Sequence, residues 1–277
     1  MQENEVKNNS ISEEHSDRSD SEATIIENLQ ACIIQDKKLI EKYQNLTVND
    51  KCVYQKDGGN VEVQLVSLFI ENDKDIIASL ENIESLSLSN NQIVSIKPLK
   101  NLVKLEYLNL YKNQIQSLND LSGLKNLNTL ELAENQIYSL EGLEGLENIQ
   151  KLALDENLIE DLQPLKDLTT LTELNLCENR IQNIDALKNL TNLKVLDLYK
   201  NIIQNIDVLK NLTVLKDLWL GKNQIESVKA LEHLVTLENL ELVDNQTSDF
   251  SSIRHHKNFR NYITCALTHE HDSIDIE

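Results

Sequence analysis

The chain has 277 residues, of which 26% are charged and only 4% are aromatic, and its formal net charge is −20. This length exceeds that of a minimal domain, and the scarcity of aromatic residues excludes a typical globular core. The negative charge repels phosphate, and no basic patch is interleaved with aromatic residues, so nucleic acid is not an expected partner. No apolar stretch approaches the ~20 residues that span a bilayer, so a membrane is not expected either.

Residues 1–23 are polar, Ser-rich and acidic, and we expect them to form a disordered tail. They contain no apolar core of a secretory signal. The cysteines share no spacing and are interpreted as reduced thiols; they are Cys32, Cys52, Cys177 and Cys265. Both observations predict an intracellular protein, in the nucleus or the cytoplasm.

Residues 24–59 are expected to form a helical N-terminal cap. Apolar residues as far as Leu46 recur at the spacing of one or two amphipathic helices. Such helices would hide the open end of the repeats that follow. After an Asp-Gly-Gly turn, Val63, Val66 and Leu68 resemble the start of a first repeat that is two residues shorter than the others.

From residue 83 onward, one frame of aliphatic residues recurs every 22 positions without a slip. Each unit has the form LxxLxLxxNxIxxLxxLxxLxx, and a strict period of this kind is the signature of leucine-rich repeats stacked into a solenoid. One asparagine marks each unit, and together they form a ladder: Asn91, Asn113, Asn135, Asn157, Asn179, Asn201, Asn223 and Asn245.

The frame predicts the local structure of each unit. In Leu108-Asn109-Leu110 the leucines point inward and the asparagine outward, which is the alternation of a short strand. Strands of successive units would stack in parallel into one concave sheet. The later apolar positions are three residues apart, which suits 3₁₀ or irregular turns on the convex side. Pro98 and Pro164 fall in the same phase of that segment, where the backbone can do without a donor.

The repeated asparagine is predicted to be buried where the chain turns after each strand. Its amide has a donor and an acceptor for backbone groups of its own turn and of the neighbouring unit. Those groups would otherwise be buried unpaired at ~1–3 kcal/mol each. We therefore expect an α/β solenoid, a right-handed superhelix with a parallel concave sheet. Its repeats would cover residues 60–248 in about nine units, followed by a C-terminal cap at 249–277.

Outward-facing positions beside the strand leucines form the candidate binding surface, which begins with Ser85 and Ser87. The only Trp of the chain, Trp219, is expected to face solvent there, and Trp and Tyr are enriched among interface hot spots. The alternative is that Trp219 merely covers the strand beside it. The nearby carboxylates favour a basic partner surface. The predicted partner-binding residues are Glu131, Glu173, Asn175, Asp197, Tyr199, Asp217, Trp219 and Glu241.

The sequence offers little support for catalysis. It has only six glycines and no Gly-rich phosphate loop. Cys265, His269 and His271 have a spacing that could bind zinc, but a polar cap surface is the favoured interpretation. We therefore predict a protein that is not an enzyme and that carries no cofactor or metal.

The C-terminal segment FRNYITCALTHEHDSID, from Phe259 to Asp275, resembles a cap found in intracellular proteins with 22-residue repeats. It is most similar to the cap of the leucine-rich-repeat regulatory subunit of type 1 protein phosphatase, from which it departs by about one inserted residue and by Thr268 where a Pro is common. That family carries a Trp on the concave strand of its penultimate unit and an Asp on the strand before, which Trp219 and Asp197 match.

The resemblance implies a regulatory subunit that binds the type 1 phosphatase catalytic subunit through its concave face and is a monomer alone. The aromatic residues of the family's middle units are not matched, because Glu131, Ala153 and Asn175 stand there. Two alternatives remain open. One is a structural or axonemal adaptor similar to a dynein light chain, and the other is a bacterial-type surface repeat protein.

Overall fold

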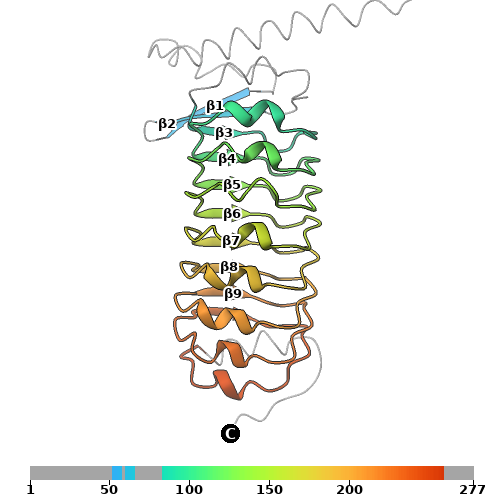
Figure 1. Ribbon diagram of the computed structural model, residues 1–277. Helices are drawn as coiled ribbons and strands as arrows, with labels where there is room; N and C mark the ends of the chain where they lie inside the picture. The colour runs from blue at the N-terminus through green and yellow to red at the C-terminus, as the bar shows by residue number, and fades with distance from the viewer. Residues whose placement is uncertain (1–51, 58–59, 66–82, 259–277) are drawn as a thin grey trace, which may run out of the picture.

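One sheet runs along the whole described length of the rod (Figure 1). The computed structural model describes residues 52–57, 60–65 and 83–258. In these residues ten strands lie side by side in chain order. They are β1 (Cys52–Asp57), β2 (Asn60–Leu65), β3 (Ser85–Ser87), β4 (Tyr107–Asn109), β5 (Thr129–Glu131), β6 (Lys151–Ala153), β7 (Glu173–Asn175), β8 (Val195–Asp197), β9 (Asp217–Trp219) and β10 (Asn239–Glu241).

From β3 to β10, each strand pairs with the next in parallel, and every pair joins residues 22 positions apart. Leu196, for example, lies opposite Leu218. A slip of one residue would turn each of these leucines toward solvent, so the constant repeat length and the buried leucines specify one register. The predicted leucine-rich-repeat solenoid with a parallel sheet is confirmed.

The N-terminal end of the sheet differs from the prediction. Cys52–Asp57 were expected to belong to a helical cap, but they form β1, which pairs antiparallel with β2. The sequence explains this strand, because Val53 and Tyr54 favour extended backbone and the following Asp-Gly-Gly is a hairpin signal.

Strand β2 then pairs in parallel with β3, and Val63 lies opposite Leu86. Val66 and Leu68 of the expected first repeat lie outside the described residues, as do the tail at residues 1–23 and the predicted helices of residues 24–51.

The core is a column of aliphatic side chains. The middle leucine of every strand from β3 to β10 is between 0% and 4% exposed. The isoleucine two residues after each ladder asparagine from Asn91 to Asn223 is equally buried, from Ile93 to Ile225, and Thr247 takes this position after Asn245. Burying one such side chain stabilises the fold by ~1.5–3 kcal/mol. Because each unit contacts only its neighbours, these contributions add up along the rod.

The opposite side of the rod consists of short 3₁₀ helices, as predicted. Pro98 and Pro164 occupy the first turns of two of them, where a backbone donor is not needed. Between β5 and β6 no such helix is present, and Gly142 has a φ of 102°. The helices are η1 (Lys97–Asn101), η2 (Asn119–Leu121), η3 (Gln163–Leu165), η4 (Asp185–Asn189), η5 (Asp207–Asn211), η6 (Lys229–Leu231) and η7 (Ser251–Ile253).

The ladder asparagines connect each unit to the one before it. Asn113 Nδ2 donates to the carbonyls of Leu110 and Leu88, both at 3.0 Å, and Asn113 Oδ1 accepts from the Ile93 amide at 3.0 Å. The same three bonds recur at each later ladder position through Asn245. Asp has no amide donor and could not make the two carbonyl bonds.

The residue before each ladder asparagine has a left-handed backbone conformation. Its φ lies between 51° and 57° in all eight units, although none of these residues is glycine. A side chain in this region costs about 1 kcal/mol or more. The asparagine bonds and the buried strands hold the turn in place against this strain. These residues are Asn90, Lys112, Glu134, Glu156, Glu178, Lys200, Lys222 and Asp244.

A second ladder of hydrogen bonds lies where the chain enters the strands. Asn126 Nδ2 donates to the Val103 carbonyl at 2.8 Å, and Thr236 Oγ1 donates to the Thr213 carbonyl at 3.0 Å. Val214 interrupts this ladder, because its side chain has no donor. This second ladder was not among the features predicted from the sequence. The equivalent bonds in other units are made by Asn148, Thr170 and Asn192.

After the last full repeat, Ile253 of η7 is completely buried and Phe250 packs against the core. Residues 249–258 therefore contribute to covering the last unit. The predicted cap helix and the closing segment of residues 259–277 lie outside the described residues. Among the described residues, no helix has the length and apolar character to cross a membrane.

Candidate functional site: the outer face of the sheet

Two rows of side chains flank the central leucines on the outer face of the sheet, which we call the sheet face. The first row holds the first residue of each strand from β3 to β10, and the second row holds the last. Most of these side chains are exposed or half-buried. Ser87 is the exception: it was expected to face solvent, but it is only 2% exposed.

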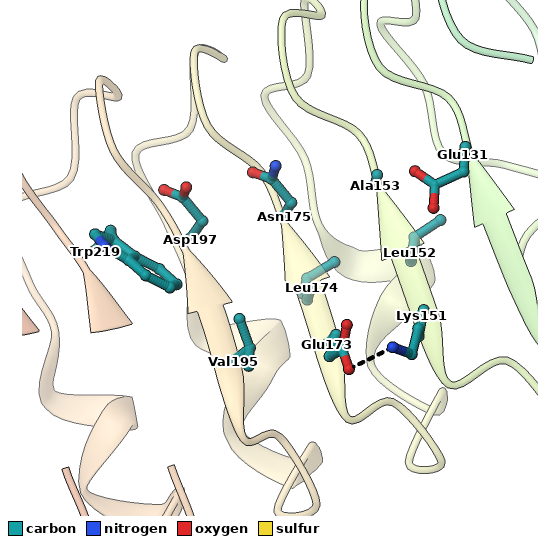
Figure 2. Close-up of a pocket in the computed structure, with 10 residues that line it drawn as sticks. All are labelled: Glu131, Lys151, Leu152, Ala153, Glu173, Leu174, Asn175, Val195, Asp197 and Trp219. Carbon is teal, nitrogen blue, oxygen red and sulfur yellow. Dashed lines mark ion pairs between the residues drawn. The ribbon is translucent and has the colours of Figure 1, made fainter. Parts of the chain in front are cut away.

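A hollow of about 300 Å³ lies on the sheet face across β5 to β9 (Figure 2). Three of the predicted residues, Tyr199, Asp217 and Glu241, do not line it. The other five do, and Figure 2 shows them spread across the strands from Glu131 at one end to Trp219 at the other. The full lining is Glu131, Lys151, Leu152, Ala153, Glu173, Leu174, Asn175, Val195, Asp197 and Trp219.

The hollow exists because Ala153 is small. It stands in the second row between Glu131 and Asn175 (Figure 2). Its single methyl group extends less far from the sheet than the side chains on either side, so the surface is depressed at this point. The predicted binding residues did not include Lys151, Ala153 or Val195. All three are the first or last residue of a strand, and these positions face outward in every unit. Their place in the repeat could therefore have identified them from the sequence.

Trp219 is the last residue of β9, and Asp197 lies opposite it at the end of β8. The neighbours Leu218 and Leu220 are fully buried, so they anchor the strand in the core. Trp219 itself is half-buried. Part of the indole thus covers the sheet and part remains accessible in the wall of the hollow.

The carboxylates around the hollow are partly desolvated. Burial raises the pKa of Asp197 above its usual value, although the carboxylate also accepts a hydrogen bond from the Tyr199 amide at 2.9 Å. Burial and the nearby Asp155 raise the pKa of Glu131. The pKa of Asp155 is raised by burial as well. Removal from water disfavours the charged form of a carboxyl group, so a cation brought to this face would offset an existing electrostatic penalty.

The one lysine of the hollow forms an ion pair with none of these three groups, although its charge partly offsets the rise in the pKa of Glu131. Lys151 Nζ lies 2.7 Å from Glu173 Oε1, an ion pair that Figure 2 marks with a dashed line. Within the described residues, neither Glu131 nor Asp197 takes part in a salt bridge. The face therefore keeps two carboxylates without a bound cation.

A second group of predicted residues lies beside the hollow. Lys222 Nζ is 5.3 Å from the centre of the Tyr199 ring, within the range of a cation–π contact. Gly221 allows this packing: a Cβ there would lie 2.6 Å from Glu241 Oε1 and 3.0 Å from Tyr199 Cδ2. Burial and then the charge of Asp197 raise the pKa of Glu241, which links this group to the hollow.

The described residues offer no evident catalytic group. Burial, followed by the charge of Asp197, raises the pKa of the Cys177 thiol to about 12, so the thiolate needed for nucleophilic chemistry does not form near neutral pH. In the described part of the chain, no three His, Cys, Asp or Glu side chains gather as metal ligands. The Cys265, His269 and His271 spacing lies outside it.

Comparison with known proteins agrees with this architecture, which is that of a leucine-rich-repeat solenoid. A family model described as leucine-rich repeats (2 copies) matches residues 81–123 and 169–211. Internalin C2 of Listeria monocytogenes is 34% identical over 66% of this chain and 80% of its own, with a TM-score of 0.62. A leucine-rich-repeat protein of Leptospira interrogans is 32% identical over 61% of this chain and 45% of its own, with a TM-score of 0.59. No curated protein matches the chain.

The chain belongs to the leucine-rich-repeat family. Proteins of this family generally act as scaffolds that bind other proteins. The family and the fold do not by themselves identify the partner, which has to be argued from the surface of this chain.

Proposed function

We propose that the chain is a non-catalytic scaffold that binds a protein partner through the sheet face of β5–β10, with Trp219 as the central contact. The observation that carries this proposal is the half-buried Trp219 in the wall of the hollow, next to Asp197. A large aromatic side chain at the edge of a depression can enter a partner's surface while its base stays fixed, which is typical of interface hot spots.

The partner's contacting surface is basic. Glu131, Asp155, Asp197 and Glu241 all have raised pKa values on this face, with burial as the largest cause. Lysine or arginine side chains of a partner would relieve this penalty, and the formal net charge of −20 would speed the approach of such a partner at low salt.

The resemblance of the C-terminal segment and of Trp219 and Asp197 implies the type 1 phosphatase catalytic subunit as this partner. The structure adds a supporting observation, because Asp197 lies directly opposite Trp219 and Asp217 begins the same strand. The similarity to proteins of Listeria and Leptospira favours a second candidate. It is a repeat protein of bacterial type that uses the same face for an unrelated protein partner.

The affinity of the purified phosphatase catalytic subunit for the wild-type chain and for Trp219→Ala tests the first candidate. Loss of a central aromatic contact costs ~2–4 kcal/mol, a weakening of roughly 30- to 1000-fold. Lys166→Ala, on the opposite side of the rod directly after η3, is the matched control and should bind as the wild type does. Circular dichroism checks that both variants are folded.

A wild-type chain that does not bind the phosphatase rules out that partner but leaves the site open. A photo-crosslinking residue placed at position 195, which lines the hollow and leaves Trp219 in place, or at position 166 as a control, then captures partners from a cell extract. Crosslinked protein that appears at 195 and not at 166, and that is lost when Trp219→Ala is added, supports the site. Equal capture at both positions, or capture at 195 that Trp219→Ala does not reduce, refutes it.

A further inference from the structure

The charges of the hollow are separated across the sheet. Glu131 is on β5 and Asp197 is on β8, three strands away. At ~4.8 Å between strands, their backbones are roughly 14 Å apart. One guanidinium group cannot reach both carboxylates, so full neutralisation of the hollow requires two cations.

The charge of Asp197 is not required by the turn in which it lies. Asp197 Oδ1 accepts a hydrogen bond from the amide two residues later, at 2.9 Å. Asn109 and Asn175, at the same position of their units, make the same bond with neutral side chains at 2.9 and 3.0 Å. An asparagine would serve the turn here as well, without the penalty of a desolvated carboxylate.

The Glu131 carboxylate is likewise unused by the fold. Within the described residues, no hydrogen bond or salt bridge holds it, because Lys151 pairs with Glu173 instead. Between the two carboxylates lies the low part of the row at Ala153 (Figure 2). A chain that crosses the strands can lie there close to the sheet.

We propose that the hollow binds an extended partner segment with two basic side chains four residues apart, one paired with Glu131 and the other, an arginine, with Asp197 beside Trp219. Residues four apart on an extended chain are ~13–14 Å apart and point to the same side, which matches the separation of the two carboxylates. The residue midway between them would lie over Ala153 and Asn175 and should be small. This proposal rests on the proposed function, since it specifies the partner of the same face.

Arginine is preferred at the Asp197 end because of Trp219. A planar guanidinium group can pair with a carboxylate through two parallel hydrogen bonds while its face stacks on the indole, whereas an ammonium group has no planar face to stack. Glu131 has no aromatic neighbour among the residues that line the hollow, so either basic side chain suits that end.

Peptides test the proposal, and Trp219 reports their binding because it is the only Trp in the 277 residues. The probe is acetyl-Ser-Arg-Thr-Ser-Thr-Arg-Ser-amide, which has its two arginines four apart. The control, acetyl-Ser-Thr-Arg-Ser-Arg-Thr-Ser-amide, has the same composition with the arginines two apart. Titration followed by fluorescence should show that the probe binds about tenfold more tightly than the control.

Variants of the chain locate the contacts. Asp197→Asn and Glu131→Gln should each weaken probe binding about three- to tenfold and leave control binding nearly unchanged. Glu226→Gln, which removes an exposed carboxylate away from the hollow, should change neither. Ala153→Leu, which fills the hollow, should abolish the preference for the probe.

Equal binding of the two peptides would overturn the proposal, since the attraction would then be a general effect of the negative chain. So would variants at Glu131 and Asp197 that behave like Glu226→Gln. In either case, the separate binding test of Trp219→Ala decides whether the sheet face is an interface at all.

Discussion

The interior of this rod and its sheet face differ in how they use the repeat. At the middle of β3–β10 the same residue, leucine, occurs eight times and is almost fully buried each time. The last residue of the same strands changes from Ser87 through Ala153 and Asp197 to Trp219 and Glu241. The constant positions have one task, to pack against identical neighbours. The variable positions do not pack in the core, so their side chains can differ in size and charge, and these differences create the hollow and its charges.

Outside the leucine core, the largest expected effect comes from a position where the regular path of the chain is interrupted. Gly142→Ala would place a Cβ 2.2 Å from the Leu118 carbonyl oxygen, at a φ of 102°. We expect the free energy of unfolding to fall by more than about 2 kcal/mol, measured by denaturant titration. The matched change Glu156→Gly, in the left-handed turn before Asn157, should stay within about 1 kcal/mol of wild type. If the free energy of unfolding of Gly142→Ala also stayed within about 1 kcal/mol of wild type, neighbouring units could not be rigidly packed at this position.

The two hydrogen-bond ladders should differ in their contribution. Asn157→Ala leaves the buried carbonyls of Leu132 and Leu154 and the Ile137 amide without their bonds, so we expect a loss of ~1–3 kcal/mol. Asn126→Ala removes one exposed bond to the Val103 carbonyl, which water can replace, and should cost less than about 1 kcal/mol. Thermal unfolding measures both. If the two variants lost equal stability, the burial of the hydrogen bonds would not determine how much each ladder contributes.

The smallest effect should come from a charge on the sheet face. Burial raises the folded-state pKa of Asp197, so the ionised group lowers stability above its ordinary pKa, and this penalty is relieved as the pH falls through the folded value. Asp197→Asn should therefore raise the free energy of unfolding at pH 7, by less than about 1 kcal/mol because the group is partly solvated. The gain should disappear near pH 3, below the ordinary pKa. A loss of stability at pH 7 would show that Asp197 supports the fold.

The sequence was sufficient where one residue type recurs. The period of Leu108 and Leu130 predicted the strands and their register, and the spacing after Asn113 predicted the 3₁₀ turns. The second ladder was missed because its position holds asparagine in some units, threonine in others and valine in one, so no single residue type recurs there. Recognising it required the geometry of Asn126 and Thr170 against the preceding units.

The hollow could be predicted only in part. Glu131, Asp197 and Trp219 were identified because charge and aromatic character are visible in a sequence. Ala153 was not, because it acts by being smaller than its spatial neighbours 22 residues away. The strand β1 was missed for a related reason: its pairing with β2 is made once and does not recur along the chain.

The most direct test of this division is a pair of adjacent substitutions on β9, Leu218→Ala and Trp219→Ala, with the free energy of unfolding measured for each by denaturant titration. Leu218 is fully buried, so Leu218→Ala should lower the free energy of unfolding by ~2–5 kcal/mol. Trp219 is half-buried and faces outward in the wall of the hollow, so Trp219→Ala should cost less than Leu218→Ala, about 1–2 kcal/mol, and part of the indole remains available to a partner. If Trp219→Ala proved as destabilising as Leu218→Ala, the indole would be a structural cover for the sheet, and the proposed binding face would lose its main support.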